Sequence, residues 1–200
     1  VTGISLSENQ IKYCKEKAKE LNLDNQVRFE LLDYRSVNSK FDRIVSIGAF
    51  EHFGKKFYKT FFKKVKNIMH DDGICLLHTI GSVDKPGPIQ PFIQKYIFPG
   101  GIIPSLSEMM IPIEKTGLVL SDCETLIHHY DKTLKAWLDR FMENKGKAKY
   151  LYNKEFVRMW EFYLSSCSAG FKFRDLVVYQ LQLVKNFTAL PSNRRNYIYQ

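Results

Sequence analysis

IVSIGAFEHFG, residues 44–54, is the stretch that decides the fold of this chain. An apolar run ends there in a small-residue turn, and Glu51 and His52 follow at its exit. Because residues 41–48 are apolar almost throughout, they predict a β-strand buried on both faces of its sheet. In an open α/β sheet, ligands bind in the crevice beyond the carboxyl ends of the strands. We therefore expect Glu51 to take part in chemistry.

Neighbouring segments supply the rest of the predicted sheet. Residues 7–10, SENQ, have the pattern of a capping box, and apolar positions at helical spacing continue the helix to Leu21. Strands and helices then alternate, which predicts an α/β fold with a doubly wound, mostly parallel sheet. The elements expected in this half are strands over 27–32, 41–48 and 74–80, an amphipathic helix over 56–69 and a turn over 70–73.

The pattern changes after Gly81, where proline and glycine punctuate a long irregular stretch. A loop of that length inside a compact domain is usually functional, so we expect a lid insertion over about 82–116. A helical insertion is expected over about 131–170, and no linker divides the single domain 1–200. The later elements expected are helices over 105–115, 133–144 and 154–168, a strand over 118–129 broken near Asp122, and a final antiparallel strand over 175–184.

Composition restricts the class of protein. The chain is 44% hydrophobic and 26% charged, which is typical of a soluble globular domain. No apolar run reaches the roughly 20 residues that span a bilayer, and the first residues resemble a strand end rather than a signal peptide. Four cysteines without CxxC spacing predict reduced, mostly buried thiols. We therefore expect a cytoplasmic protein.

A formal charge of +9 favours an anionic partner. A solvated helix face and attraction to an anionic membrane surface explain the excess equally well. Nucleic acid is disfavoured, because no motif that reads it is present. The basic residues that carry much of the excess are Lys55, Lys56, Lys59, Lys63, Lys64, Lys66, Arg194 and Arg195.

Several sequence words at the predicted strand ends point to one family. They are VTGISLSENQ, LLDYR, FDRIVSIGAFEHFG, LLHTIG, KYIFPGG, HHYDKTL and RMWEFYLSSCSAGF, in this order. Together they resemble the S-adenosylmethionine-dependent family of cyclopropane-fatty-acid synthases and mycolic acid cyclopropane synthases, up to about Asn186. The resemblance implies a Rossmann-like class I methyltransferase fold with helical lid insertions.

One departure from the family concerns its glycine-rich cofactor loop. A GCGWG-like word is expected just before Val1, so we expect the first strand and first helix of the fold to be missing and the chain to be the C-terminal part of such an enzyme. The family cysteine in that loop has no counterpart here, since Cys14 lies inside a predicted helix. An inactive lipid- or anion-binding fragment, with weak or absent cofactor binding, is therefore an alternative.

The resemblance also implies a mechanism. In the family, an acyl-chain alkene attacks the sulfonium methyl, and loss of a proton to bicarbonate closes the three-membered ring. Glu51 would accept from the bicarbonate hydroxyl, while His78, Tyr130 and the backbone of Ile80 complete its site. Each has an ordinary alternative: Glu51 could cap the next helix, and His78 and Tyr130 could be satisfied core residues.

The resemblance places the cofactor along the predicted strand ends. His52, His128 and His129 do not have the spacing of a metal site, so no metal is expected. The residues implied to bind S-adenosylmethionine are Ser5, Leu6 and Gln10 around the ribose and methionine part, Asp33 and Tyr34 at the adenine, and Ile47 and Gly48 on the floor.

Taken together, these features predict transfer of a methylene group from S-adenosylmethionine to the cis double bond of an unsaturated phospholipid acyl chain. The proline-rich segment and the late helices would form the acyl channel. The protein would lie at the cytoplasmic side of an anionic inner membrane, with no nucleic-acid partner. A related C-methyltransferase that gives a branched product is the alternative, and a homodimer is left open.

Overall fold

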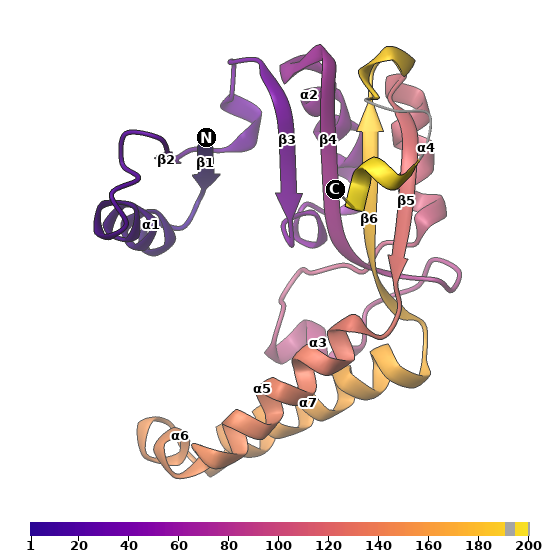
Figure 1. Cartoon of the computed structure of the whole chain (residues 1–200). Helices are drawn as coiled ribbons and strands as arrows, with labels where there is room; N and C mark the ends of the chain where they lie inside the picture. Colours follow the sequence, from indigo (N-terminus) through magenta and orange to yellow (C-terminus); the bar gives the residue numbers. More distant parts are fainter. Residues whose placement is uncertain (191–194, 200) are drawn as a thin grey trace.

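The computed structural model describes residues 1–190 and 195–199, whose strands form two sheets (Figure 1). β1 (Thr2–Ser5) and β2 (Arg28–Leu31) pair in parallel on either side of α1 (Glu8–Glu20) in the chain. The second sheet has the order β3-β4-β6-β5. Arg194 of the predicted basic group lies outside the described residues.

In the larger sheet, β3 (Phe41–Ile47) is parallel to β4 (Met69–Ser82), and β6 (Leu176–Val184) is antiparallel to both β4 and β5 (Val119–Leu126). The predicted α/β class and the antiparallel last strand are confirmed. The predicted break near Asp122 is a register shift in β5. The remaining helices are α2 (Tyr58–Ile68), α3 (Pro91–Tyr96), α4 (Leu106–Thr116), α5 (His129–Glu143), α6 (Lys145–Leu151) and α7 (Lys154–Phe173).

The start of α1 follows the capping prediction in part. The hydroxyl oxygen of Ser7 accepts from the backbone N–H of Gln10 at 3.3 Å, which satisfies one N-terminal donor of the helix. The reciprocal half of a capping box is wrong, because the side-chain oxygen of Gln10 instead accepts from the Ser5 hydroxyl at 2.7 Å. This bond ties the end of β1 to the first turn of α1.

The main core lies between one face of the larger sheet and helices α2 and α4. Leu77 of β4 and Leu181 of β6 are fully buried against Phe62 of α2 and Met109 of α4. The amphipathic character predicted for the 56–69 helix is confirmed at Phe61 and Val65, which are buried, whereas Phe57 of the predicted apolar face is 37% exposed. Since α4 is a core helix, it is not part of the lid expected over 82–116, and a lid in the segment before α4 stays a prediction.

A smaller core joins the α5–α7 hairpin to the carboxyl ends of β4 and β5 and to the start of β6. Leu134 of α5 and Leu164 of α7 are each 1% exposed and pack in one cluster with Val178 of β6. Figure 1 shows the hairpin extending from the sheet edge where β3 ends, with α6 at its far tip. Within residues 1–190 and 195–199, no helix is both long and apolar enough to cross a bilayer.

Two predictions about the central strands are wrong. β3 is not buried on both faces, since Val45 is 59% and Ile47 is 68% exposed. β3 is an outer strand of its sheet, and the α5–α7 hairpin packs at the ends of β4, β5 and β6 rather than on this face of β3 (Figure 1). The turn expected at 70–73 lies within β4: pairing already begins at Phe41 and Met69, resumes at Arg43 and Ile74, and the irregularity between these pairs is a bulge of β4 over residues 70–73.

Gly81 provides a stability test of the approach between β4 and the proline-rich segment. A Cβ there would lie 2.5 Å from the Tyr179 ring and 2.8 Å from the backbone oxygen of Pro104, so Gly81→Ala is expected to cost about 1–3 kcal/mol of unfolding free energy. A Cβ at Gly146 meets nothing within 4 Å, and Gly146→Ala is expected to stabilise by about 0.4–1 kcal/mol. Urea unfolding measures both, and an equal response of the two variants would contradict the prediction.

Candidate functional site

The turn after β3 carries Glu51 to the carboxyl end of β4. Gly48 begins this turn with φ +62°, and its N–H donates to the backbone oxygen of His78 at 3.1 Å. Glu51 Oε1 then accepts from the backbone N–H of Ile80 at 2.7 Å. The alternative that Glu51 merely caps the following helix is therefore wrong, because its carboxylate faces β4.

The second carboxylate oxygen of Glu51 has no partner. Oε2 is buried and, within the described part of the chain, accepts no hydrogen bond. An unpaired buried acceptor is costly and is rare in native proteins. This oxygen can therefore accept a hydrogen bond from a bound group that carries a hydroxyl or amino proton.

Tyr130, near the start of α5, is a neighbour of this carboxylate. Burial raises the pKa of the Tyr130 phenol, and the negative charge of Glu51 raises it further. The phenol therefore stays protonated at neutral pH and can donate. Its ring packs against Phe171 of α7 with a centroid distance of 4.9 Å, so the α5–α7 hairpin sets its position.

His78 is half-buried on β4, where the antiparallel register places it opposite Gln180 of β6. Gln180 Nε2 lies 3.2 Å from His78 Nδ1, and an amide nitrogen can only donate. In this arrangement Nδ1 accepts, so Nε2 of the neutral ring carries the proton and can donate. Nδ1 of His78 is therefore satisfied by a contact within the protein, whereas Nε2 can donate to a bound group.

Ile80 differs in detail from its implied role. Its backbone N–H is already bound by Glu51, so Ile80 first of all positions the carboxylate. The backbone of Glu51 is also held from the other side, because Ile102 N–H donates to its carbonyl oxygen at 2.9 Å. The proline-rich segment is thereby fastened to the site.

Gln180 and Ile102 are contacts that sequence reasoning missed. Gln180 is one of two glutamines on the same side of an alternating strand, and nothing in the sequence distinguishes it from Gln182. Its pairing with His78 depends on the register of β4 and β6. For Ile102 there was no signal, because the contact uses only its backbone N–H.

Among the cofactor candidates, the residues from β1 and β3 present an open surface. Leu6 is 72% and Ile47 is 68% exposed at the carboxyl ends of these strands. A Cβ at Gly48 would meet nothing within 4 Å. Since β1, β2, β3 and β4 belong to parallel pairs, this is the kind of strand-end surface on which α/β proteins bind ligands.

Asp33 and Tyr34 follow β2 as predicted. The Asp33 carboxylate accepts three hydrogen bonds from Arg35: from its backbone N–H at 2.8 Å, from Nε at 2.9 Å and from Nη2 at 2.6 Å. These bonds lower the pKa of the Asp33 carboxyl. A carboxylate has about four acceptor positions, so one remains for an amino group. The Tyr34 ring lies 4.9 Å from Phe53, which connects this turn to the one that carries Glu51.

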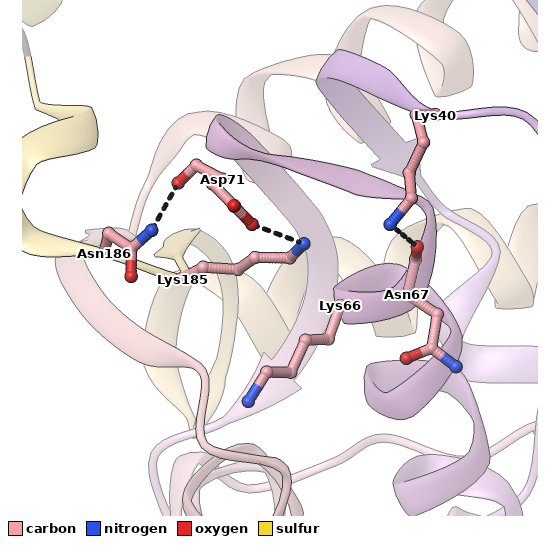
Figure 2. A pocket seen from close by; sticks show the side chains of 6 residues that line it. All are labelled: Lys40, Lys66, Asn67, Asp71, Lys185 and Asn186. Atoms are coloured by element: carbon pink, nitrogen blue, oxygen red, sulfur yellow. Dashed lines mark hydrogen bonds and ion pairs between the residues drawn. The ribbon is translucent and has the colours of Figure 1, made fainter.

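At the opposite edge of the sheet lies a basic hollow of about 470 Å³ (Figure 2). Its lysines already bind backbone oxygens at the ends of α2 and α4: Lys40 donates to Asn67 at 2.5 Å, and Lys66 to Thr116 at 2.8 Å. Lys185 binds Met69 in the same way. Such contacts stabilise helix C-termini, and we read the hollow as structural. In the described residues no cluster of three His, Cys, Asp or Glu side chains could hold a metal ion.

Comparison with known proteins gives a consistent result. Residues 1–181 match the family described as mycolic acid cyclopropane synthetase. The cyclopropane-fatty-acyl-phospholipid synthase of Escherichia coli K12 is 39% identical over 181 residues, which are 90% of this chain and 46% of that protein. The chain thus spans about half the length of that relative.

Solved structures agree with the sequence match. The cyclopropane synthase MmaA2 from Mycobacterium tuberculosis has a TM-score of 0.85 at 32% identity, over 92% of this chain and 69% of that one. The mycolic acid cyclopropane synthase CmaA1 complexed with SAH and CTAB has a TM-score of 0.83 at 31% identity, with the same coverage of 92% and 69%.

Proposed function

The chain belongs to the mycolic acid cyclopropane synthetase family, and we propose that it transfers a methylene group from S-adenosylmethionine to the cis double bond of an unsaturated phospholipid acyl chain. The product would carry a cyclopropane ring. The observation that carries this proposal is the buried carboxylate of Glu51, with one oxygen fixed by Ile80 and the other without a partner.

Two bound groups are required for this reaction. S-adenosylmethionine supplies the methyl group, and bicarbonate, when bound, accepts the proton that leaves as the ring closes. The co-crystallised SAH of the CmaA1 structure supports the first, since SAH is what remains of S-adenosylmethionine after methyl transfer. Ser5, Leu6, Gln10, Asp33, Tyr34, Ile47 and Gly48 would hold the cofactor at the strand ends.

The chemistry of the donor set supports bicarbonate. This anion offers one hydroxyl donor and two charged oxygens, so its site needs one acceptor and at least two donors. Glu51 Oε2 is the acceptor, while His78 Nε2 and the Tyr130 hydroxyl are donors. The negative charge of Glu51 beside this anion favours its protonation, while the two donors hold its charged oxygens in place.

Aromatic side chains can exclude water from this site. The ring of Phe98, in the proline-rich segment, lies 6.1 Å from His52 and 6.2 Å from Tyr163 of α7. Burial raises the pKa of Tyr163 to about 12, so this wall stays neutral. An alkene is a weak nucleophile, and a dry, apolar wall would both bind the acyl chain and keep water from competing.

The experiment incubates the full chain with S-adenosylmethionine and phospholipid whose acyl chains carry one cis double bond. Gain of one CH₂ in the mass of the lipid, with ring protons in its NMR spectrum, supports the proposal. A methyl-branched lipid would overturn ring formation while leaving methyl transfer intact. No change in the lipid, in a sample that binds S-adenosylmethionine, would overturn both.

Gln180 gives a test of a positioning residue. Gln180→Met keeps the length of the side chain but removes the donor to His78 Nδ1, so the ring loses its fixed tautomer. One hydrogen bond of this kind is worth about 1 kcal/mol, and we expect kcat to fall about fivefold with KM for S-adenosylmethionine unchanged. Gln182→Met, two residues along β6, is the control. The ¹⁵N spectrum of His78 should show a mixture of tautomers only in the Gln180 variant; a single Nε2–H tautomer there would contradict the role.

A further inference from the structure

The tip of the α5–α7 hairpin carries an exposed apolar patch. Tyr150 is 89%, Leu151 is 70% and Tyr152 is 64% exposed, in a run of three consecutive residues at the end of α6. Figure 1 places α6 at the far end of the hairpin from the sheet. We call residues 145–154 the tip surface. Large apolar side chains gathered on one exposed element usually mark an interaction site.

The tip surface is also strongly basic. Its ten residues, KGKAKYLYNK, include four lysines and no carboxylate, and all four lysines are exposed. Lys145 pairs with Glu161 of α7 at 3.2 Å. Within the described residues, Lys147, Lys149 and Lys154 take part in no ion pair. Lysine interspersed with tyrosine and leucine is the composition that suits the interface of an anionic bilayer.

Aromatic rings connect the tip surface with the proposed site. Along α7, Tyr152 stacks on Phe156 at 4.2 Å, Phe156 on Trp160 at 5.6 Å, and Trp160 meets Tyr163 at 5.2 Å. Tyr163 in turn contacts Phe98 beside the turn of Glu51. The row thus runs from the exposed tip to the wall of the site, and it provides an apolar surface along the whole hairpin.

The lysines of α2 and the turn before it are a weaker candidate for the same role. Lys55 pairs with Glu108 at 2.5 Å, and Lys66 donates to the carbonyl oxygens of Thr116 and Gly117. Within residues 55–66, all of which the structure describes, Phe57, at 37%, is the one large exposed apolar residue. Charge without apolar surface is typical of a solvated helix face.

We propose that the tip surface docks the chain on an anionic phospholipid bilayer, with Lys147, Lys149 and Lys154 at the head groups and the Tyr150–Tyr152 run in the interface. This inference rests on the proposed function, since it names the surface by which that site meets its lipid. A lysine can lay its apolar stem along the bilayer interface while its ammonium group stays at the head groups. A tyrosine ring is apolar with a polar hydroxyl, so it suits the same depth of the bilayer.

The test measures partition of the full chain onto sedimenting vesicles, made either of equal parts phosphatidylglycerol and phosphatidylethanolamine or of phosphatidylcholine alone. Each lysine at an anionic surface contributes about fivefold, so K147Q/K149Q/K154Q is expected to lower partition onto the anionic vesicles by roughly 100-fold. Y150S/L151S/Y152S is expected to lower it at least tenfold, with little recovery at low salt. The charge-matched control K56Q/K59Q/K63Q, on exposed positions of α2 and its preceding turn, should change partition less than fivefold.

Three results would overturn the proposal: equal partition onto both kinds of vesicle, a loss in the α2 control as large as in the tip variants, or tip residues that govern self-association in sedimentation velocity while partition is unchanged. Because all substituted side chains are exposed, unchanged thermal unfolding is the check on folding.

Methyl transfer to detergent-dispersed lipid separates this inference from the proposed function. Tip variants that methylate dispersed lipid but not vesicle lipid would support docking. A wild-type chain that binds vesicles but methylates neither lipid would overturn the proposed function and leave the docking proposal intact.

Discussion

Glu51→Gln is expected to lower kcat for lipid methylation by about 10²–10⁴-fold, the range by which a positioned acid–base group accelerates a reaction. The amide oxygen can still accept from Ile80 N–H, but an NH₂ group would replace the orphaned Oε2. An acceptor thereby becomes a donor, and the hydroxyl of a bound bicarbonate loses its partner. Rates of methyl transfer from labelled S-adenosylmethionine measure the loss.

The same substitution has a distinctive effect on stability. A buried carboxylate oxygen without a partner destabilises the folded state, so Glu51→Gln is expected to leave the unfolding free energy unchanged or raise it by about 1 kcal/mol. Glu114→Gln, at an exposed position of α4, is the control and should change neither quantity. A Glu51 variant that is destabilised and inactive together would point to a structural role and contradict ours.

Phe50→Ala is expected to cost about 3–5 kcal/mol of unfolding free energy, the usual cost of emptying the place of a buried phenylalanine. Phe50 is 0% exposed, stacks on Tyr58 at 4.2 Å and contacts Phe61 at 5.3 Å and Phe62 at 5.5 Å. For a chain of this length the midpoint of thermal unfolding should fall by roughly 10 °C. In the control Phe187→Ala, at a position that is 79% exposed, the midpoint of thermal unfolding should fall by no more than about 2 °C.

This substitution also tests how the site is held in place. Phe50 immediately precedes Glu51 in the turn, so loss of its anchor should reduce activity even at temperatures where the variant is fully folded. Ile47 and Gly48, which are proposed to bind the cofactor, come just before Phe50 in the same segment, so cofactor affinity is expected to fall as well. Full activity of folded Phe50→Ala would show that the contacts of Glu51 with Ile80 and Ile102 suffice to place the carboxylate.

Much of the fold was predictable because its signals are local. The cap at Ser7, the apolar face of α2 and the alternation of β6 each depend on residues close together in the chain, and the structure confirms them. The errors come from tertiary context. The apolar residues of β3 gave no sign that Val45 and Ile47 would lie on an uncovered face, since that depends on where the α5–α7 hairpin packs. The helix predicted over 105–115 is confirmed as α4, but the sequence did not show that it packs in the main core rather than in a lid.

By itself, the sequence determined which side chains could carry chemistry, because the type of a residue and its place after an apolar run are written in the order of amino acids. Glu51 was found in this way, whereas His78 and Tyr130 were singled out only by the resemblance to the family. Only the tertiary structure decided how they are used. The bond from Ile80 to Glu51 and the contact of the Gln180 amide with His78 join residues that are 29 and 102 positions apart in the chain. Contacts at such separations follow from strand register and packing, and these depend on the whole chain at once.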